Sequence, residues 1–575
     1  MSDQQTSEPP RTGWRSLRSF FSSGRVFALI GVMACAVAVV TIAYLLIRLS
    51  DDRPVTYLDA RDHFKHGSTG GERGWKKQLG FGVPYWMWVA LPELFPEYLP
   101  DQKPGAGYSS LGMIYEAGKD PRFDLPIGMS MRRVMGIDRV YFTCSVCHTG
   151  SVRERPGAPP QIVLGMPSNT LDFGRLAQFL ELSAQDWRFQ AGHIMPKIAM
   201  LADTRERTAS TGRGYRPARF GAIDRAIFQY YGVGVMRDQL LTLLGQLSFL
   251  DFRSWGPGRV DTFNPPKSLL GFRMEHAPDS EKVGVADFPS VWNQRARKGM
   301  SLHWDGNNCS VDERNLSAGF GTGATPATVD AVSLLRIADW LWQDAQPPAF
   351  PAIRIDPDLA IRGEPIYQEY CQKCHGTRSA PFRGGADQDT SQLGRVTPIE
   401  EVATDTSRLD SYTPELARAQ NLLYAGTPAD ASGEACRAYA ESICQPAGDD
   451  AAYRAQRATC YPSRFSHFRK TYGYANQPLD GLWLRAPYLH NGSVPTLAAL
   501  LEPSHDRPGV FFTGYDVYDF ANVGFVTSGP DAERRGWRYD TMIRGNGNQG
   551  HEGPAYGTAL PPDDKRALLE YLKTF

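Results

Sequence analysis

The chain has 575 residues, of which 42% are hydrophobic and 22% are charged, the composition of an ordinary globular protein with two or three domains. Its 62 basic residues balance 62 acidic residues, so no nucleic-acid partner is expected. Glycine (56) and proline (42) are both frequent, which predicts extensive loops.

The first predicted element is a transmembrane helix over residues 26–47. This uninterrupted apolar run has the length that a helix needs to cross a bilayer. Arginines precede it and residues of mixed charge follow, so the positive-inside rule places a tail of residues 1–25 in the cytoplasm. A cleaved secretory signal is the alternative, but the run is longer than a usual signal core and no small-residue cleavage site follows it. We therefore expect a single-pass protein of the inner membrane, with the bulk of the chain in the periplasm.

The next segments alternate between loops and short elements. Residues 51–110 are rich in aromatic residues and proline, which predicts a packed, loop-rich cap and no long regular helix. Residues 138–143 have the pattern of extended chain, and residues 171–191 show helical periodicity. Residues 330–343 form a stronger amphipathic pattern that ends at a proline-rich stretch. That stretch is the best linker in the chain, so we place a domain boundary near residue 345.

Two copies of the motif C-x-x-C-H carry the strongest chemistry: Cys144, Cys147 and His148, and Cys371, Cys374 and His375. Two thiols at this spacing can add to the two vinyl groups of one haem, and the histidine then lies beneath the iron as a ligand. A zinc site would need paired cysteines closer together, and a redox C-x-x-C pair has no need of the histidine. The motifs therefore predict two covalently bound haem c groups, each with its iron.

The second motif lies in a setting that resembles a class I cytochrome c domain. Gly363 and Tyr367 precede it at helical spacing, and residues 562–575 form an amphipathic helix. In class I domains the two corresponding helices cross, and the small glycine permits a close approach. With the helical patterns above, this predicts a mainly α fold. It would hold two cytochrome c-type haem domains with extensive loops, residues 51–345 and 346–575, after one N-terminal transmembrane helix.

The remaining cysteines fall into two groups. Cys35 lies within the apolar run and is expected to be inert. The other four are an even number on the exported side of the membrane, where disulfides persist: Cys309, Cys436, Cys444 and Cys460. Three of them lie between residues 436 and 460, so one bridge within that stretch is expected, although the spacing does not say which pair forms it.

Each haem iron has a further coordination position, which a histidine or methionine fills in electron-transfer proteins. His551 follows a glycine-rich loop and is expected to be the further ligand of the second iron. His490 could also be a ligand, but a hydrogen-bonding role near that haem is preferred. His303 lies between the two motifs in the sequence. It could bind the first iron, stand over it as an acid–base group, or be purely structural.

Longer motifs carry a family resemblance. They are HFKHGS (63–68), PYWMW (84–88), LHWDGN (302–307), RAPYLHNGSVPTL (485–497), FFTGYDVYD (511–519) and GNGNQGHE (545–552). They resemble the rubber-oxygenase-like branch of the di-haem cytochromes c, distant relatives of the bacterial di-haem cytochrome c peroxidases. The resemblance implies that His375 and His551 bind the second iron from opposite sides, with His490 nearby. Rubber oxygenases have a phenylalanine over the first haem where this chain has His303 and Trp304, so little or no rubber cleavage is expected.

The resemblance favours a peroxidase-like oxidoreductase. Electrons would enter at the second haem from a small cytochrome or cupredoxin, and peroxide or oxygen would react at the first, where His303 could move protons. The alternative is a non-catalytic electron carrier in which each iron has two histidine ligands. The strength of the further ligand on the first iron separates the two. Trp340 and Trp342 are expected in the core, with a relay role between the haems as the other option.

Overall fold

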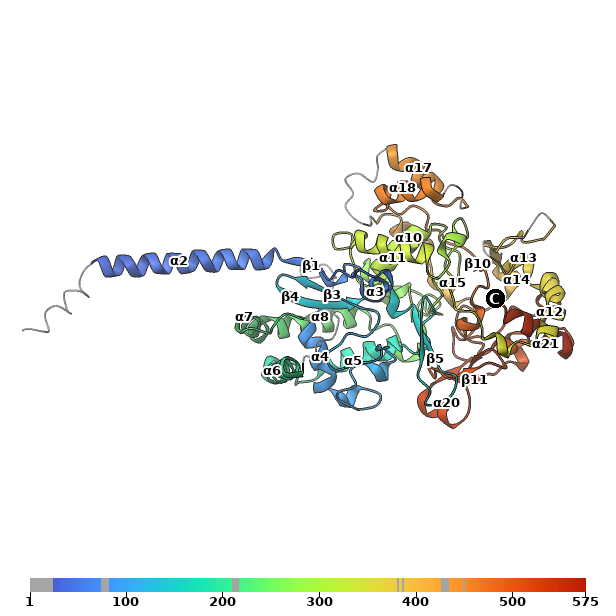
Figure 1. Cartoon of the computed structure of the whole chain (residues 1–575), viewed down its shortest axis with the longest axis horizontal. Coiled ribbons are helices and arrows are strands. Elements are labelled where there is room, and N and C mark those ends of the chain that lie inside the picture. Colours follow the sequence, from blue (N-terminus) through green and yellow to red (C-terminus); the bar gives the residue numbers. More distant parts are fainter. Residues whose placement is uncertain are drawn as a thin grey trace, which may run out of the picture. The chain divides into compact units, whose positions relative to one another are not determined.

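The structure is a computed structural model that describes residues 24–73, 82–208, 217–379, 382–384, 387–423, 425, 434–446, 448 and 450–575 (Figure 1). Residues 1–23 of the predicted cytoplasmic tail lie outside the described residues. The chain divides into two compact units. One comprises the N-terminal residues up to Arg53 with the short segment Arg133–Ile137, and the other comprises Pro54–Arg132 with Asp138–Phe575.

The first unit contains one long helix, α2 (Gly24–Leu49). Its segment Val26–Leu49 has a mean hydropathy of 2.7 and is long and apolar enough to cross a membrane. Apolar side chains such as Phe27 and Ile47 are exposed on it, and no partner helix covers them among the described residues. The predicted apolar helix over residues 26–47 is therefore present.

The prediction of a mainly α fold is wrong. Helices account for 45% of the structure and strands for 11%, and the strands form many small sheets. Five of the sheets in the described residues are antiparallel pairs. They include β5 (Thr149–Val152) with β6 (Gln161–Leu164), β7 (Arg259–Asp261) with β8 (Val285–Asp287), and β11 (Val510–Thr513) with β14 (Trp537–Asp540). Strands this short cannot show an alternating pattern, and β5 and β8 are buried along their whole length. The sequence therefore contained no strand signal at these short, buried strands.

Three elements predicted from the sequence before residue 345 are present in the structure. The extended chain before Cys144 is β4 (Ile137–Phe142), which pairs with β2 (Val83–Pro84). The predicted helix at 171–191 is α5 (Phe173–Gln185). The helix at 330–343 is α11 (Ala331–Gln343), and the Asp330 side chain caps its first turn by accepting a hydrogen bond from the Ser333 amide. Other helices of this region are α3 (Ala60–His66), α4 (Tyr85–Leu94), α6 (Ala191–Thr208), α8 (Val233–Gln246) and α10 (Val311–Gly321).

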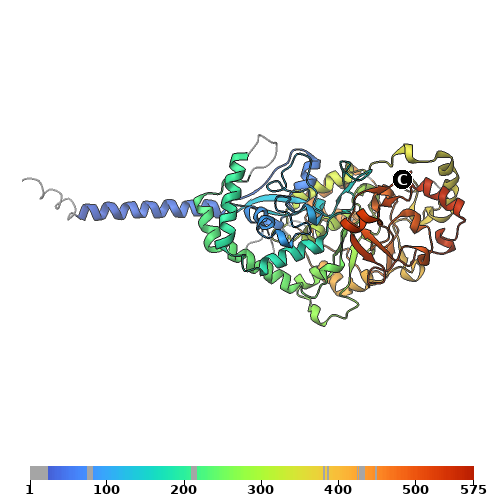
Figure 2. The same cartoon turned by 90° about the horizontal axis from the view of Figure 1, so that it is seen from below.

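The predicted helix crossing beside the second motif is confirmed. Helices α12 (Pro357–Tyr370) and α21 (Pro562–Leu572) lie side by side in both views (Figures 1 and 2). A Cβ atom on Gly363 would lie 2.0 Å from the carbonyl oxygen of Ala567, so only glycine permits this approach. The Tyr367 ring contacts Tyr571 at 5.3 Å and Phe575 at 4.8 Å between ring centres.

One hydrophobic core takes residues from both sides of residue 345. It includes Trp292 and Trp340 from the first half and Tyr367, Trp483 and Leu568 from the second. Both halves therefore depend on the same buried surface for their stability. The division into haem domains at residues 51–345 and 346–575 stays a prediction.

Two disulfides join the four cysteines outside the motifs and the apolar helix. Cys436–Cys460 links α17 (Glu434–Ser442) to α18 (Asp450–Cys460), which confirms the bridge expected within that stretch. Cys309–Cys444 connects residues 135 positions apart in the sequence and fastens the same helical pair to the loop before α10. The motif cysteines and Cys35 form no disulfide.

Candidate functional site

The first motif lies where a strand turns into a short helix. Strand β4 ends at Phe142, the 3-10 helix η4 (Cys144–Val146) follows, and β5 begins directly after His148. The Nδ1 atom of His148 is 2.8 Å from the carbonyl oxygen of Pro289. Because a carbonyl can only accept, Nδ1 carries the proton and Nε2 is left with a free lone pair. This is the tautomer that a histidine needs to bind a metal through Nε2.

The second motif follows the end of helix α12. The short helix α13 (Gln372–His375) carries its histidine, and Nδ1 of His375 is 2.8 Å from the carbonyl oxygen of Gln477. The Tyr367 hydroxyl donates to the Gly376 carbonyl at 2.6 Å and ties the motif back to the helix. The two motifs thus differ in secondary structure but orient their histidines by the same kind of hydrogen bond.

The motif side chains are partly buried at each site. The cysteines and histidines of both motifs keep part of their surface accessible. Burial nevertheless raises the pKa of Cys144 to about 11 and that of Cys147 to about 12, and it lowers the pKa of His148 to about 3. Burial likewise raises the pKa of Cys371 to about 12. Neutral thiols and a neutral imidazole in such dry surroundings are compatible with haem attachment.

His551 faces His375 across the second site. The two ring centres are 6.2 Å apart and the ring planes form an angle of 48°. Two imidazoles that bind one iron from opposite sides need ring centres about 6 Å apart, because each metal–nitrogen bond is about 2 Å long and each ring adds about 1 Å. The residues present therefore fit a haem iron between them.

The loop that carries His551 is held by features that the sequence did not reveal. Gly550 has φ +84°, and a Cβ atom there would lie 2.4 Å from the Thr404 amide nitrogen. The guanidinium of Arg507 donates to the carbonyl oxygens of Gly550 at 2.9 Å and His551 at 3.3 Å. The His551 amide donates to Val402 at 2.8 Å. Arg507 has no sequence motif that marks it, so it was missed.

The His490 ring is hydrogen-bonded to a neighbouring tyrosine and stacks on it. Its Nε2 atom is 3.0 Å from the Tyr474 hydroxyl, and the two rings stack with centres 4.1 Å apart. Its carbonyl oxygen accepts from the Asp287 amide at 2.9 Å. Because Nε2 is already in a hydrogen bond, the geometry agrees with the expected hydrogen-bonding role, and its proximity to a haem stays a prediction.

His303 lies in a tight loop with φ +64°. Its Nδ1 atom is 2.5 Å from the Asn307 side-chain oxygen, and the Leu302 amide donates to the Asn308 carbonyl at 2.7 Å. The amide oxygen fixes the proton on Nδ1 and leaves Nε2 with a lone pair. Burial lowers the pKa of His303 to about 4, so its imidazole is neutral near pH 7.

Arg314 is a charged residue at the first site that sequence reasoning missed. Its positive charge lowers the pKa of both His148 and His303, so its guanidinium lies near both. Burial lowers the pKa of Arg314 itself to about 10. No carboxylate pairs with it in the described ranges. Ser310 and Glu313 form an S-x-x-E helix-start pattern, which would have predicted helix α10 and placed Arg314 in its first turn.

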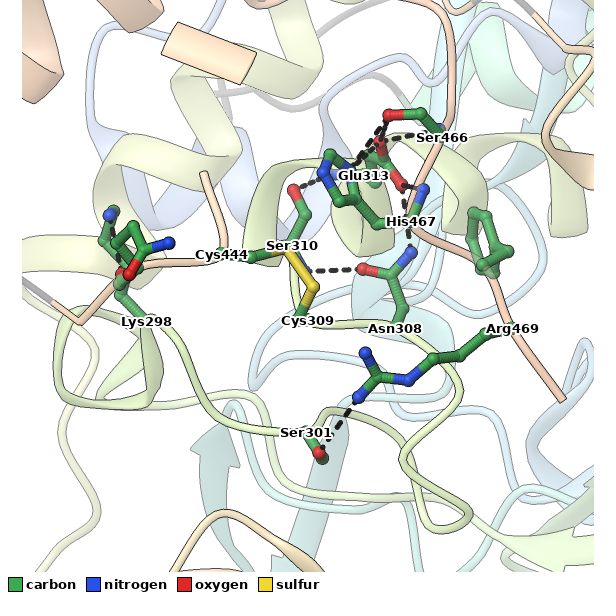
Figure 3. Close-up of a disulfide and its surroundings, with 12 residues drawn as sticks. Lys298, Ser301, Asn308, Cys309, Ser310, Glu313, Cys444, Ser466, His467 and Arg469 are labelled. Atoms are coloured by element: carbon green, nitrogen blue, oxygen red, sulfur yellow. Dashed lines mark hydrogen bonds and ion pairs between the residues drawn. A yellow bond between two sulfur atoms is a disulfide. The ribbon is translucent and has the colours of Figure 1, made fainter. Parts of the chain in front are cut away.

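The start of α10 is fastened to the rest of the fold on several sides (Figure 3). The Glu313 carboxylate accepts from Asn308 Nδ2 at 3.0 Å and lies 2.7 Å from Nδ1 of His467. Beside it, Cys309 is bonded to Cys444. The loop that holds His303 and the helix that holds Arg314 are therefore kept in one position.

The tryptophans before residue 345 lie in the core. Trp340 packs on Phe64 with ring centres 4.7 Å apart. Trp342 stacks on Tyr453 at 5.3 Å and donates through Nε1 to Asp450 at 3.0 Å. These contacts agree with the expected core role, and a relay role for either residue stays a prediction.

Two C-x-x-C-H motifs with oriented histidines, one of them facing a second imidazole, are the features of a c-type cytochrome. Comparison with known proteins agrees, since residues 473–512 match the family model described as RoxA-like, cytochrome c-like. The chain is 32% identical over 483 residues to the uncharacterized protein y4iJ of Sinorhizobium fredii, covering 76% of each chain. It is 30% identical over 311 residues to the uncharacterized protein y4iM of the same organism, covering 50% of this chain and 64% of the relative. The chain belongs to the family of y4iJ and carries a RoxA-like cytochrome c domain, which makes it a haem c-binding protein.

Proposed function

We propose that this protein is a membrane-anchored di-haem c-type cytochrome oxidoreductase with peroxidase-like activity. The first haem is held by Cys144, Cys147 and His148, and the second by Cys371, Cys374, His375 and His551. The observation that carries the proposal is the His375–His551 pair, whose 6.2 Å ring separation suits one iron. In the described ranges, the His148 ring has no imidazole as close to it.

This difference assigns separate roles to the two sites. Haem c, when bound, supplies one-electron redox chemistry and, where a coordination position is open, reactivity toward peroxide. At the second site, His375 and His551 would hold the haem iron between them, and the group would supply electron exchange only. At the first site, His148 would hold the haem iron, and His303 and Arg314 would be the groups that act on bound peroxide.

His303 and Arg314 suit the reduction of peroxide at the first site. The neutral imidazole of His303 can accept a peroxide proton at Nε2 and return it to the departing hydroxide, so that water leaves. Asn307 holds the ring in the tautomer that this transfer needs. The guanidinium of Arg314 stabilises the negative charge that develops on oxygen.

One observation favours the electron carrier as a second candidate. The positive charge of Arg314 lowers the pKa of both His303 and His148, so both imidazoles lie near the same guanidinium. The hydrogen bond to Asn307 occupies Nδ1 of His303 and leaves the lone pair of Nε2 for a metal. A small movement of the loop could make His303 a ligand, and both irons would then have two histidines. The rigid anchoring of this loop supports the peroxidase-like function.

Two features support export and anchoring. Helix α2 is long and apolar enough to span the inner membrane, and the arginines before it suit the cytoplasmic side. Both disulfides belong in an oxidising compartment such as the periplasm. The electron donor or acceptor is a small soluble cytochrome or cupredoxin of that compartment.

The test combines electron paramagnetic resonance with stopped-flow kinetics on the full-length protein. We expect one low-spin and one high-spin signal from the oxidised protein. Mixing the half-reduced protein with hydrogen peroxide should oxidise it rapidly, and His303→Ala should slow the reaction about 100-fold or more. His505→Ala, at an exposed histidine, is the matched control and should change nothing. Two low-spin signals, with peroxide reactivity only in His303→Ala, would show that the protein is a carrier.

A further inference from the structure

One helical segment of the fold has apolar side chains on two opposite faces. Helix α7 (Ala222–Ile227), the π-helical turn η5 (Phe228–Gly232) and helix α8 follow one another without a break. The inner face of this segment is buried in the fold through Phe228, Val233, Met236, Leu240 and Leu244. Burial of that face stabilises the segment as it does in other amphipathic helices.

The outer face of the first half of this segment is apolar as well. Tyr230 is 87% exposed, Tyr231 53% and Ile223 45%, and Ala226 is exposed between them in the sequence. Arg225 is the one exposed charged residue on α7 and η5. A surface helix normally carries several charged residues on its outer face, so this face has the character of a contact surface. Ile223, Ala226, Tyr230 and Tyr231 are called the outer stripe below.

The π-helical turn explains why two neighbouring tyrosines are both exposed. In η5 the Val233 amide donates to the Phe228 carbonyl, which lies five residues back instead of four. The wider turn reduces the angle between neighbouring side chains, so Tyr230 and Tyr231 are both exposed while Phe228 and Val233 stay buried. Turns of this kind are rare and occur frequently at functional sites.

Helix α2 holds the following chain close to the bilayer. It ends at Leu49, and the Val55 amide already donates to the Met131 carbonyl at 3.3 Å. The chain from Leu49 to Val55 spans at most about 20 Å when it is fully extended. Strand β3 (Met129–Val134), which contains Met131, therefore stays within that reach of the end of α2.

The outer stripe is tied to the sheet that contains β3. Strand β4 is the neighbour of β3 in this sheet. The Asp138 carboxylate, near the start of β4, accepts from the Ala218 amide at 2.6 Å, and α7 begins four residues later (Figure 1). The stripe therefore belongs to the part of the fold that the chain enters directly after the anchor.

We propose that the outer stripe docks onto the surface of the bilayer that α2 spans, on the side where α2 ends at Leu49. The proposal rests on the membrane anchoring proposed above. Tyrosine is enriched where proteins meet the lipid headgroups, because its ring is apolar and its hydroxyl is polar. Ile223 and Ala226 add apolar contact with the acyl chains, and the guanidinium of Arg225 faces lipid phosphates.

The anchor makes a weak contact sufficient. A short tether holds the stripe near the lipid at an effective concentration on the order of millimolar. A few exposed side chains then bind the membrane surface, although the same side chains would not recruit a soluble protein to it. Because α2 and the stripe are two separate points of attachment, docking restricts the rotation of the fold on the membrane.

The experiment measures this contact in the full-length, haem-loaded protein, with one chain in each nanodisc of phosphatidylethanolamine and phosphatidylglycerol. Cys35→Ser removes the thiol of α2, and Ala226→Cys then takes an environment-sensitive NBD fluorophore. Lipids with a nitroxide on the fifth acyl carbon should quench this probe by about half. The same probe at Tyr472→Cys is the matched control, since Tyr472 is 69% exposed outside the stripe, and it should keep its fluorescence.

Substitutions in the stripe separate docking from mere proximity to lipid. With the probe at residue 226, Tyr230→Asp should reduce the quenching about threefold or more, because a negative charge is costly at the boundary of headgroups and acyl chains. Tyr230→Trp should retain the quenching, since tryptophan favours the same boundary. Tyr472→Asp should leave it unchanged. Haem content and circular dichroism, measured in parallel, report that each variant is folded.

Quenching at residue 226 that survives Tyr230→Asp would overturn the proposal, because the tether alone would then keep the probe near lipid. A probe whose emission shifts to the blue only with two chains in each disc, and which the lipid nitroxide does not quench, would show that a second copy covers the stripe. Absence of quenching in a protein that resists carbonate extraction overturns the docking and leaves the anchoring intact. Release of the protein by carbonate overturns the anchoring itself.

Discussion

The two C-x-x-C-H sites orient their motif histidines in the same way, but different residues lie near those histidines. Each motif histidine is oriented by a backbone carbonyl at 2.8 Å. Across from His375 lies a second imidazole, whereas the charge of Arg314, which has no carboxylate partner in the described ranges, acts on both His148 and His303. The two motif histidines are therefore held alike, and the side chains that distant loops bring near them differ between the two sites.

The largest expected effect tests whether both sites carry haem. The double replacement of Cys144 and Cys147 by alanine, or of Cys371 and Cys374, should each remove about half of the covalently bound haem, because each pair forms its own thioether bonds. The measurement is the haem that remains with the protein after acid–acetone extraction. Cys35→Ser is the control and should lose none. Full retention in either double variant would contradict the assignment.

The second prediction tests which histidine is the further ligand of the second iron. His551→Ala should convert the low-spin signal of the second haem to high-spin, because it removes one of two strong axial ligands. Electron paramagnetic resonance of the oxidised protein measures this. His490→Ala is the control, since His490 is bonded to Tyr474, and its low-spin signal should persist. Loss of the signal in the His490 variant would reverse the choice between these histidines.

The third prediction contrasts the two disulfides. Replacing Cys309 and Cys444 by serine should lower the free energy of unfolding by about 5 kcal/mol, and replacing Cys436 and Cys460 by about 3 kcal/mol, because the longer loop loses more chain entropy. Urea unfolding followed by circular dichroism measures both. Only the first pair of replacements should also change the spectrum of the first haem, since Cys309 precedes α10. Equal spectral changes at both haems would argue against that link.

The smallest expected effect concerns Arg314. Arg314→Leu should lower the midpoint potential of the first haem by about 50 mV, or roughly 1 kcal/mol, because a nearby positive charge favours the reduced iron. Arg314→Lys keeps the charge and should restore most of the potential. Spectroelectrochemical titration resolves the two haems. A shift in midpoint potential confined to the second haem would show that Arg314 does not lie at the first site.

The sequence by itself determined the features that depend on neighbouring residues. The two motifs, the apolar helix at 26–47 and the crossing at Gly363 follow from spacing and residue type within short windows. The bridge within residues 436–460 followed from the clustering of cysteines. His551 came from its glycine-rich loop and from the family resemblance, and the structure places its ring opposite His375.

Only the tertiary structure decided the rest, because long-range contacts leave no local pattern. The short buried strands, which make the mainly α prediction wrong, lack the alternation that marks a half-exposed strand. The Cys309–Cys444 pairing, the approach of Arg314 to the first motif and the hydrogen bond between Asp138 and Ala218 join residues far apart in the sequence. Their partners are chosen by the packing of the whole core, which single-sequence periodicity cannot encode.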